Sequence, residues 1–164
     1  MKNALAAACF VLLSTGCGFQ LRGAADLPFE SIHVPGAGGI ALALKRSIHA
    51  GSRTRVVDDP KLAQAQLDVT FEARQKDILS LTAEGRVREF HLVYRVGFRV
   101  HDAKGGEFLE PVVLQVARDM TYSEAQLLAK EAEEQALYRD MQSDMVQQIM
   151  RRLASAKPPR PAAR

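Results

Sequence analysis

Cys17 is the residue whose type and surroundings point most directly to a chemical modification. A single basic residue, Lys2, precedes an apolar run at residues 4–13, and the small residues Thr15 and Gly16 stand directly before the cysteine. An apolar run behind a basic start is typical of a secretory signal peptide. Small residues before a cysteine are what the peptidase that processes bacterial lipoproteins requires. The pattern therefore predicts export followed by lipidation.

The predicted lipid would tie the chain to a membrane. We expect cleavage to remove residues 1–16, and Cys17 to carry a diacylglycerol and an N-linked acyl chain. At ~0.8 kcal/mol per buried methylene, two or more acyl chains anchor a protein stably, whereas one chain gives only marginal binding. Ser14 departs from the usual pattern, which has a leucine three residues before the cysteine. The alternative is an ordinary signal peptide with Cys17 as an incidental thiol; a membrane-spanning helix fits less well, because it needs about 18 apolar residues.

The remaining residues show no pattern of a metal site or of an active site. The histidines fall on different predicted elements: His33, His49, His91 and His101. His91 and His101 share one strand face, but ten residues at ~3.3 Å each place them about 33 Å apart, too far for one metal ion. No serine stands in the G-x-S-x-G turn of a hydrolase, and no pair of carboxylates is marked out for catalysis. The sequence predicts no metal, no cofactor and no enzyme.

The charge balance argues against nucleic acid as a partner. The chain has 22 basic and 19 acidic residues, with a net charge of +3. Lys2 and the three basic residues of the C-terminal tail lie outside the expected domain, so the domain itself is close to neutral. A basic binding site must then be a local patch rather than a general field. The absence of tryptophan also leaves little aromatic surface for stacking on bases.

The first half of the domain reads as short strands around one helix. Residues 31–34 predict a strand. Residues 40–50 predict a helix, because an apolar residue recurs at every fourth position, at Ile40, Leu44 and Ile48. Gly51 is the expected cap at the end of this helix. Residues 53–58 predict a brief strand. Residues 66–74 predict a longer one, whose alternation sets an apolar face against a polar face. We expect Leu67, Val69, Phe71 and Ala73 on the first and Gln66, Asp68, Thr70, Glu72 and Arg74 on the second.

The second half reads as a hairpin followed by a long helix. The strand at residues 89–101 has a strongly apolar face: Phe90, Leu92, Tyr94, Val96, Phe98 and Val100. A turn at residues 103–106 leads to a partner strand at residues 112–116, where Pro111 indicates a sheet edge or a bulge. Ser123 and Gln126 predict a capping box at the start of a helix that runs to about Ala154. Its expected apolar ladder is Leu137, Met141, Met145, Ile149 and Leu153, reinforced by Leu128, Ala132 and Tyr138.

This order of elements predicts an α/β two-layer sandwich. We expect a mixed sheet of about four strands with two helices on one face, the C-terminal helix being long enough to overhang the sheet. The chain divides into a signal peptide (1–16), a lipidated cysteine with its tether (17–28), a single α/β domain (29–155) and a proline-rich disordered tail (156–164).

Three segments together resemble the LptE family of lipopolysaccharide-assembly lipoproteins. They are Gly-Cys-Gly-Phe-Gln-Leu-Arg at residues 16–22, Glu-Phe-His-Leu-Val-Tyr at residues 89–94, and the helix from residue 127 to residue 153. The resemblance implies an outer-membrane lipoprotein, not an enzyme, whose α/β domain plugs the lumen of the β-barrel LptD, supports barrel assembly and binds lipopolysaccharide on its way to the cell surface. The residue after the cysteine is Gly18 rather than an aspartate, which agrees with sorting to the outer membrane. The alternative is an outer-membrane lipoprotein that scaffolds another envelope complex.

The resemblance also implies residues that contact lipopolysaccharide. The family has a basic residue near the start of the long helix, and this position is Lys130 here. The family's second basic residue lies in the loop before the aromatic strand, and this chain has Ala83 at that position, so the charge is missing there. Arg86 and Arg88 follow closely and are the candidates to supply it, because phosphates are bound by Lys or Arg. The alternative for Lys130 is a surface lysine paired with Glu133 or Glu134. The polar faces of the strands at residues 66–74 and 90–100 are expected to meet barrel wall or glycolipid.

Overall fold

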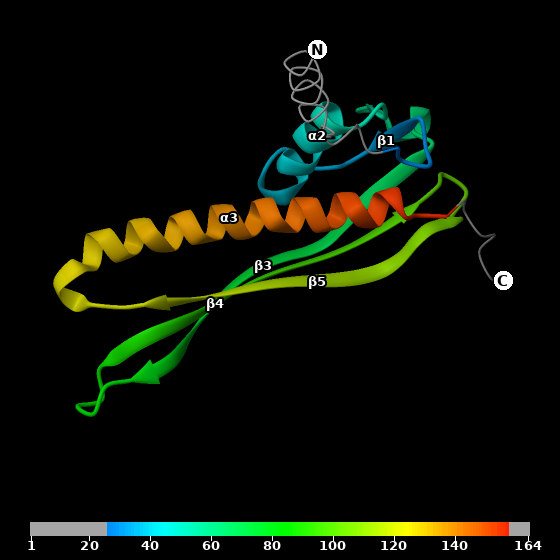
Figure 1. Cartoon of the computed structure of the whole chain (residues 1–164). Helices are drawn as coiled ribbons and strands as arrows, with labels where there is room; N and C mark the ends of the chain where they lie inside the picture. The colour runs from blue at the N-terminus through cyan, green and yellow to red at the C-terminus, as the bar shows by residue number, and fades with distance from the viewer. Residues whose placement is uncertain (1–25, 158–164) are drawn as a thin grey trace, which may run out of the picture.

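Five strands form one mixed sheet, and two helices lie against one of its faces (Figure 1). The computed structural model describes residues 26–157, so the predicted signal peptide, Cys17 and residues 158–164 lie outside it. The elements in chain order are β1 (Ser31–His33), α2 (Gly39–Gly51), β2 (Arg55–Val56), η1 (Pro60–Leu62), β3 (Ala65–Leu81), β4 (Val87–His101), β5 (Glu107–Thr121), η2 (Glu124–Gln126) and α3 (Leu127–Ala154).

The sheet order is β2-β1-β3-β4-β5. β1 runs parallel to β2 and to the start of β3, and β3, β4 and β5 form an antiparallel meander. The predicted two-layer architecture is confirmed, with five strands where about four were expected. Pro111 lies in β5, the edge strand, where a missing N–H costs no pairing.

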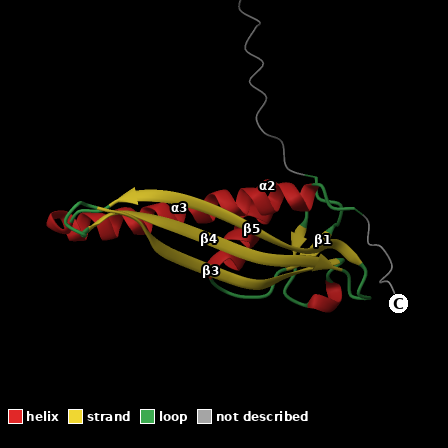
Figure 2. Cartoon of the chain, turned by 90° about the horizontal axis from the view of Figure 1, so that it is seen from below, coloured by secondary structure: helices red, strands yellow, loops and turns green. Residues whose placement is uncertain are grey.

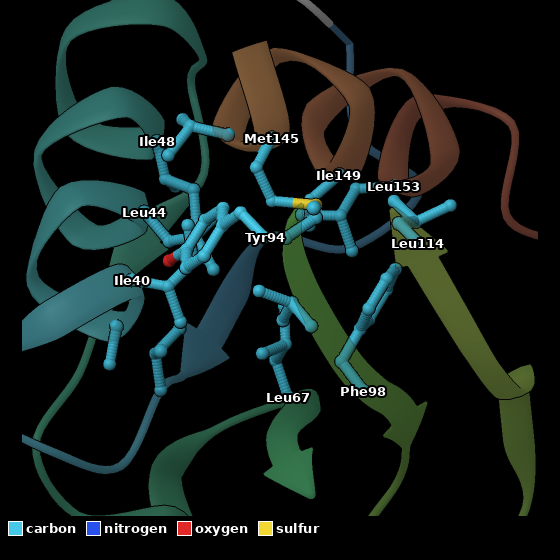
Figure 3. Packing of buried hydrophobic residues seen from close by; sticks show 14 of the residues in the cluster. Ile40, Leu44, Ile48, Leu67, Tyr94, Phe98, Leu114, Met145, Ile149 and Leu153 are labelled. Carbon is cyan, nitrogen blue, oxygen red and sulfur yellow. The ribbon is translucent and has the colours of Figure 1, made fainter. Parts of the chain in front are cut away.

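The core lies between the sheet and the two helices. The α2 ladder of Ile40, Leu44 and Ile48 is buried as predicted, and so are Met141, Met145, Ile149 and Leu153 of α3. Both ladders pack on the apolar face of β4 (Figure 3). The N-terminal part of α3 is different, because none of its residues before Tyr138 is buried. Leu128 is 80% exposed and Ala132 is also exposed, so their predicted place in the ladder is wrong and the first turns of α3 overhang the core.

A bulge in β3 reverses the predicted alternation after Val69. The register with β4 shifts between Val69 and Phe71, which places the Phe71 ring beside Gly97 on the face away from the helices. A Cβ at Gly97 would stand 2.5 Å from Phe71 Cε1, so the glycine makes room for the ring. Glu72 and Arg74 turn toward the helices instead, which corrects the expected polar face of residues 66–74. A bulge has this effect because one extra residue changes which face the following side chains occupy.

Two helix caps differ from the prediction. Ser123 makes no side-chain cap bond and leads into η2, and α3 begins at Leu127. Gly51 is still within α2, and Ser52 ends the helix with its N–H and its hydroxyl both donating to the Ile48 carbonyl. The carbonyl is therefore satisfied without the left-handed glycine that the sequence pattern suggested.

Candidate functional site

The sheet face opposite the helices is not covered by any element of residues 26–157 (Figure 2). Phe71, Gly97 and Val113 lie in register across β3, β4 and β5 at its centre. Phe71 and Val113 are exposed, and Gly97 between them carries no side chain. Val93 is buried on the same face, between Gln75 and Ala117 in the register of the strands. We call this surface the open face; its middle is apolar.

The charged groups of the open face are largely satisfied by each other. Arg99 donates from Nη2 to Asp68 Oδ2 over 2.9 Å, and His101 Nε2 lies 3.0 Å from the same oxygen. Burial acts to raise the pKa of Asp68, but the hydrogen bonds with Arg99 and His101 outweigh it and hold that pKa below its ordinary value. The carboxylate thus stays charged and keeps both partners in place. His91 Nδ1 and Asp119 Oδ1 form a second close pair, at 2.5 Å.

The three charged residues that follow the bulge bind the sheet to the helices. Glu72 accepts hydrogen bonds from the Ile40 N–H at the start of α2 and from the Tyr94 hydroxyl. The Arg74 guanidinium lies 5.1 Å from the centre of the Tyr138 ring on α3. Lys76 and Glu134 of α3 form an ion pair. The alternation of the strand predicted Glu72 and Arg74 on a solvent face, and Lys76 continues that pattern. In the structure these three charged residues stabilise the fold and are not available to a partner.

Both tyrosines of this layer keep their protons. Burial and the hydrogen bond to Glu72 raise the pKa of Tyr94, and burial and the nearby Glu134 raise the pKa of Tyr138. The Tyr138 hydroxyl donates to the Gln75 carbonyl on β3. Both hydroxyls therefore remain hydrogen-bond donors at neutral pH, and α3 stays linked to a strand that it does not cover.

The predicted lipopolysaccharide contact Lys130 is engaged within the protein. Its side chain is only 14% exposed, and Nζ lies 2.8 Å from Glu133 Oε2 and 3.1 Å from Thr121 Oγ1. Of the two pairings weighed for this lysine, the structure shows the one with Glu133. A phosphate could reach Nζ only by sharing it with that carboxylate.

The structure places Arg88 near Lys130 and Arg86 further out. Thr121, which accepts from Lys130, pairs in register with Glu89, the neighbour of Arg88. The Arg88 side chain is mostly exposed, with Nε 3.8 Å from Glu89 Oε2. Arg86 is exposed at the β3–β4 turn. The three candidates therefore share one end of the molecule, which we call the hairpin end, where β3 meets β4 and α3 begins (Figure 1).

Sequence reasoning missed a group of exposed apolar residues at the hairpin end. Ile78, Leu79 and Leu81 are exposed on β3, and Leu127 and Leu128 are exposed at the start of α3. A signal was present in the sequence, since adjacent Ile78 and Leu79 break the alternation expected of a strand with one wet face. Across residues 26–157 no helix is long and apolar enough to cross a bilayer, and no three potential ligands gather in that range to hold a metal ion.

Comparison with known proteins identifies relatives over most of the chain. A 28% identical protein from Yersinia enterocolitica, covering 87% of this chain and 70% of its own length, is named LPS-assembly lipoprotein LptE. A protein of the same name from Pectobacterium atrosepticum is 26% identical over 87% of this chain and 79% of its own.

Solved structures share the fold. The solution structure of an uncharacterized lipoprotein B from Nitrosomonas europaea is 43% identical, with a TM-score of 0.71 over 82% of this chain and 88% of that one. A minor lipoprotein from Acinetobacter baumannii is 25% identical, with a TM-score of 0.64 over 80% of this chain and 99% of that one. The family model described as LptE, lipopolysaccharide-assembly, matches residues 29–153. The chain therefore belongs to the LptE family of lipopolysaccharide-assembly proteins.

Proposed function

We propose that this lipopolysaccharide-assembly lipoprotein is anchored in the periplasmic leaflet of the outer membrane by lipid on Cys17, plugs the lumen of an LptD-type β-barrel and binds lipopolysaccharide during delivery. Membership of the LptE family supports the role in assembly. The barrel, the glycolipid contact and the membrane are the proposed part. The role is one of binding and support rather than of catalysis.

The open face carries the proposal of a barrel partner. Three strands of 15 to 17 residues present it, and the helices lie on the opposite face. Its centre combines the exposed Phe71 and Val113 with the small Gly97, around which the charges are paired within the sheet. Apolar surface surrounded by satisfied polar groups is typical of a protein interface. A broad sheet surface built from three long strands fits the inner wall of a large barrel better than it fits a small ligand.

Glutamate in place of Val113 should reduce the amount of barrel that co-purifies with the chain from detergent-solubilised outer membrane by about tenfold or more. Burying a neutral polar group without a partner costs about 1–3 kcal/mol and an unpaired carboxylate costs more, so a loss of about tenfold is the least that we expect. Val113 is 57% exposed, so the fold should tolerate the change. The measurement is the molar ratio of barrel to tagged chain after affinity purification.

Leu62→Glu is the matched control, because Leu62 is an exposed aliphatic residue on η1, beside β1 and away from the open face. It should recover as much barrel as the wild type. Equal recovery with Val113→Glu would move the interface elsewhere. If the wild type brings down another envelope protein and no barrel, the alternative of a scaffold for a different complex is favoured.

Lys130, Arg86 and Arg88 are the proposed contacts to lipopolysaccharide phosphates. All three lie at the hairpin end, and the Arg88 side chain is free enough to bind a phosphate in a bidentate manner. Lys130 would then bind a phosphate, which carries more negative charge than a carboxylate, either in place of Glu133 or together with it.

Changing these three residues together to glutamate should weaken lipopolysaccharide binding about tenfold or more, since charge-assisted hydrogen bonds contribute about 1.5–3 kcal/mol each. Arg86 and Arg88 are exposed, so their ion pairs contribute only about 0–1 kcal/mol to stability. The Lys130 side chain is 14% exposed and paired with Glu133, so any fall in the melting temperature should come from this position, and the domain should stay folded. Titration with labelled lipopolysaccharide measures the effect. Glutamate at Arg53, Arg55 and Lys61 is the control, since it changes the net charge equally near β2 and η1. Equal affinity of the two variants would place the phosphates elsewhere.

A further inference from the structure

Three large aliphatic side chains protrude at the far end of β3. Ile78, Leu79 and Leu81, which we call the apolar tip, are each at least half exposed. Ile78 lies in register with Phe90, which is partly buried and stacks edge-to-face on Tyr122 with the ring centres 5.2 Å apart. The apolar tip therefore extends an aromatic pair at the end of the core.

The backbone around the apolar tip is open as well. β1 pairs with β3 only as far as Gln66, so among residues 26–157 β3 has a neighbouring strand on one side alone from there to Leu81. Register shifts on either side of Ser80 point the apolar side chains to both faces of the hairpin. Figure 1 shows this hairpin bending away from α3. An exposed apolar strand edge is a liability unless a partner covers it.

The charges nearby select the kind of partner. Arg86 and Arg88 lie on the same hairpin, within a few residues of Leu81, and both are exposed. Lys76 Nζ stands 4.2 Å from the centre of the Phe90 ring, but it is paired with Glu134, so Arg86 and Arg88 are the two cations of the hairpin that remain for a partner. Aliphatic side chains flanked by cations complement an amphiphile that has an anionic head and an apolar tail.

We propose that the apolar tip binds the acyl chains of a phosphorylated glycolipid while Arg86 and Arg88 bind its phosphates. The proposal rests on the lipopolysaccharide binding proposed above and adds the acyl chains as the part recognised by β3. The first turns of α3 support it, because Leu127 and Leu128 expose a second apolar surface at the same end and precede Lys130 by less than one helical turn. Acyl chains adapt to such a surface because the hydrophobic effect has no direction.

The test separates the acyl chains from the head group. The chain from residue 17 onward, with Cys17→Ala so that it needs no detergent, is immobilised and titrated with purified lipopolysaccharide and with the same lipopolysaccharide after chemical removal of its acyl chains. The tip variant carries Ile78→Thr, Leu79→Thr and Leu81→Thr, since threonine suits a strand but offers less apolar surface. Leu62→Thr is the control, being an exposed leucine outside the hairpin end.

The tip variant should bind acylated lipopolysaccharide about fivefold or more weakly than the wild type, and the deacylated form within about twofold. Leu62→Thr should behave as the wild type. Suppose that the tip variant binds the acylated form as tightly as the wild type, while the variant with glutamate at Lys130, Arg86 and Arg88 binds it more weakly. The acyl site would then be wrong, and the phosphate contact would remain supported. If the wild type binds neither form, the proposed glycolipid binding fails too. If sedimentation shows a wild-type dimer that the tip variant loses without a change in affinity, a second copy covers the tip and the inference is wrong.

Discussion

Replacing Ile149 with aspartate is expected to unfold the domain. Ile149 is fully buried and faces the apolar side of β4 with Met145 and Leu153 (Figure 3). The substitution removes an aliphatic side chain from a packed site, at about 2–5 kcal/mol, and adds the cost of a buried carboxylate without a partner. The sum approaches the 5–15 kcal/mol by which domains of this size are typically stable. Met145→Asp should act in the same way.

Gln147→Asp is the control, because Gln147 is exposed on the same helix two residues away. Like Ile149→Asp, it places a negatively charged aspartate on α3 in place of a larger side chain. It should nevertheless lower the free energy of unfolding by less than about 1 kcal/mol, because the position is exposed. Thermal melts followed by far-ultraviolet circular dichroism compare the three proteins. A melting midpoint of Ile149→Asp equal to that of Gln147→Asp would mean that the α3 ladder does not face the sheet.

The parts of the fold that follow from local periodicity could be predicted. Ile40, Leu44 and Ile48 recur at helical spacing, and the alternation from Phe90 to Val100 is unbroken, so each pattern defines one buried face. The reversal after Val69 could not be predicted in this way. It depends on the room that Gly97 leaves for Phe71 on the neighbouring strand, and nothing next to Phe71 in the sequence records that contact.

The reversal also changed which residues belong to the candidate surface. Strict alternation placed Glu72 and Arg74 toward a partner and Phe71 in the core, whereas the structure places Phe71 on the open face and both charges against the helices. The basic residues Lys130, Arg86 and Arg88 came from a resemblance, and composition or spacing would not have selected them. Their common location at the hairpin end is a tertiary property, because it depends on where α3 begins relative to β4.

Replacing Cys17 with alanine is expected to abolish membrane anchoring and leave the fold unchanged. Cys17 lies outside the described residues, and the core cluster of the described part of the chain is built from residues 27–156, so we expect the fold to form without the lipid. Anchoring, in contrast, would depend on the acyl chains, each methylene of which contributes about 0.8 kcal/mol when buried in lipid. Without them, the nearly neutral domain has no strong attraction to a bilayer surface.

Detergent phase partitioning and intact-mass analysis test this, with both proteins exported. The alanine variant is placed behind an ordinary cleavable signal peptide, so that no apolar segment remains on it. The wild type should enter the detergent phase and carry the added mass of a diacylglycerol and an acyl chain on Cys17, whereas the variant should stay in the aqueous phase with an unchanged melting temperature. Cys9→Ala is the control, because Cys9 lies in the segment that cleavage removes, and it should keep both the lipid and the partitioning. An unmodified Cys17 on the mature wild-type chain would exclude the lipid anchor.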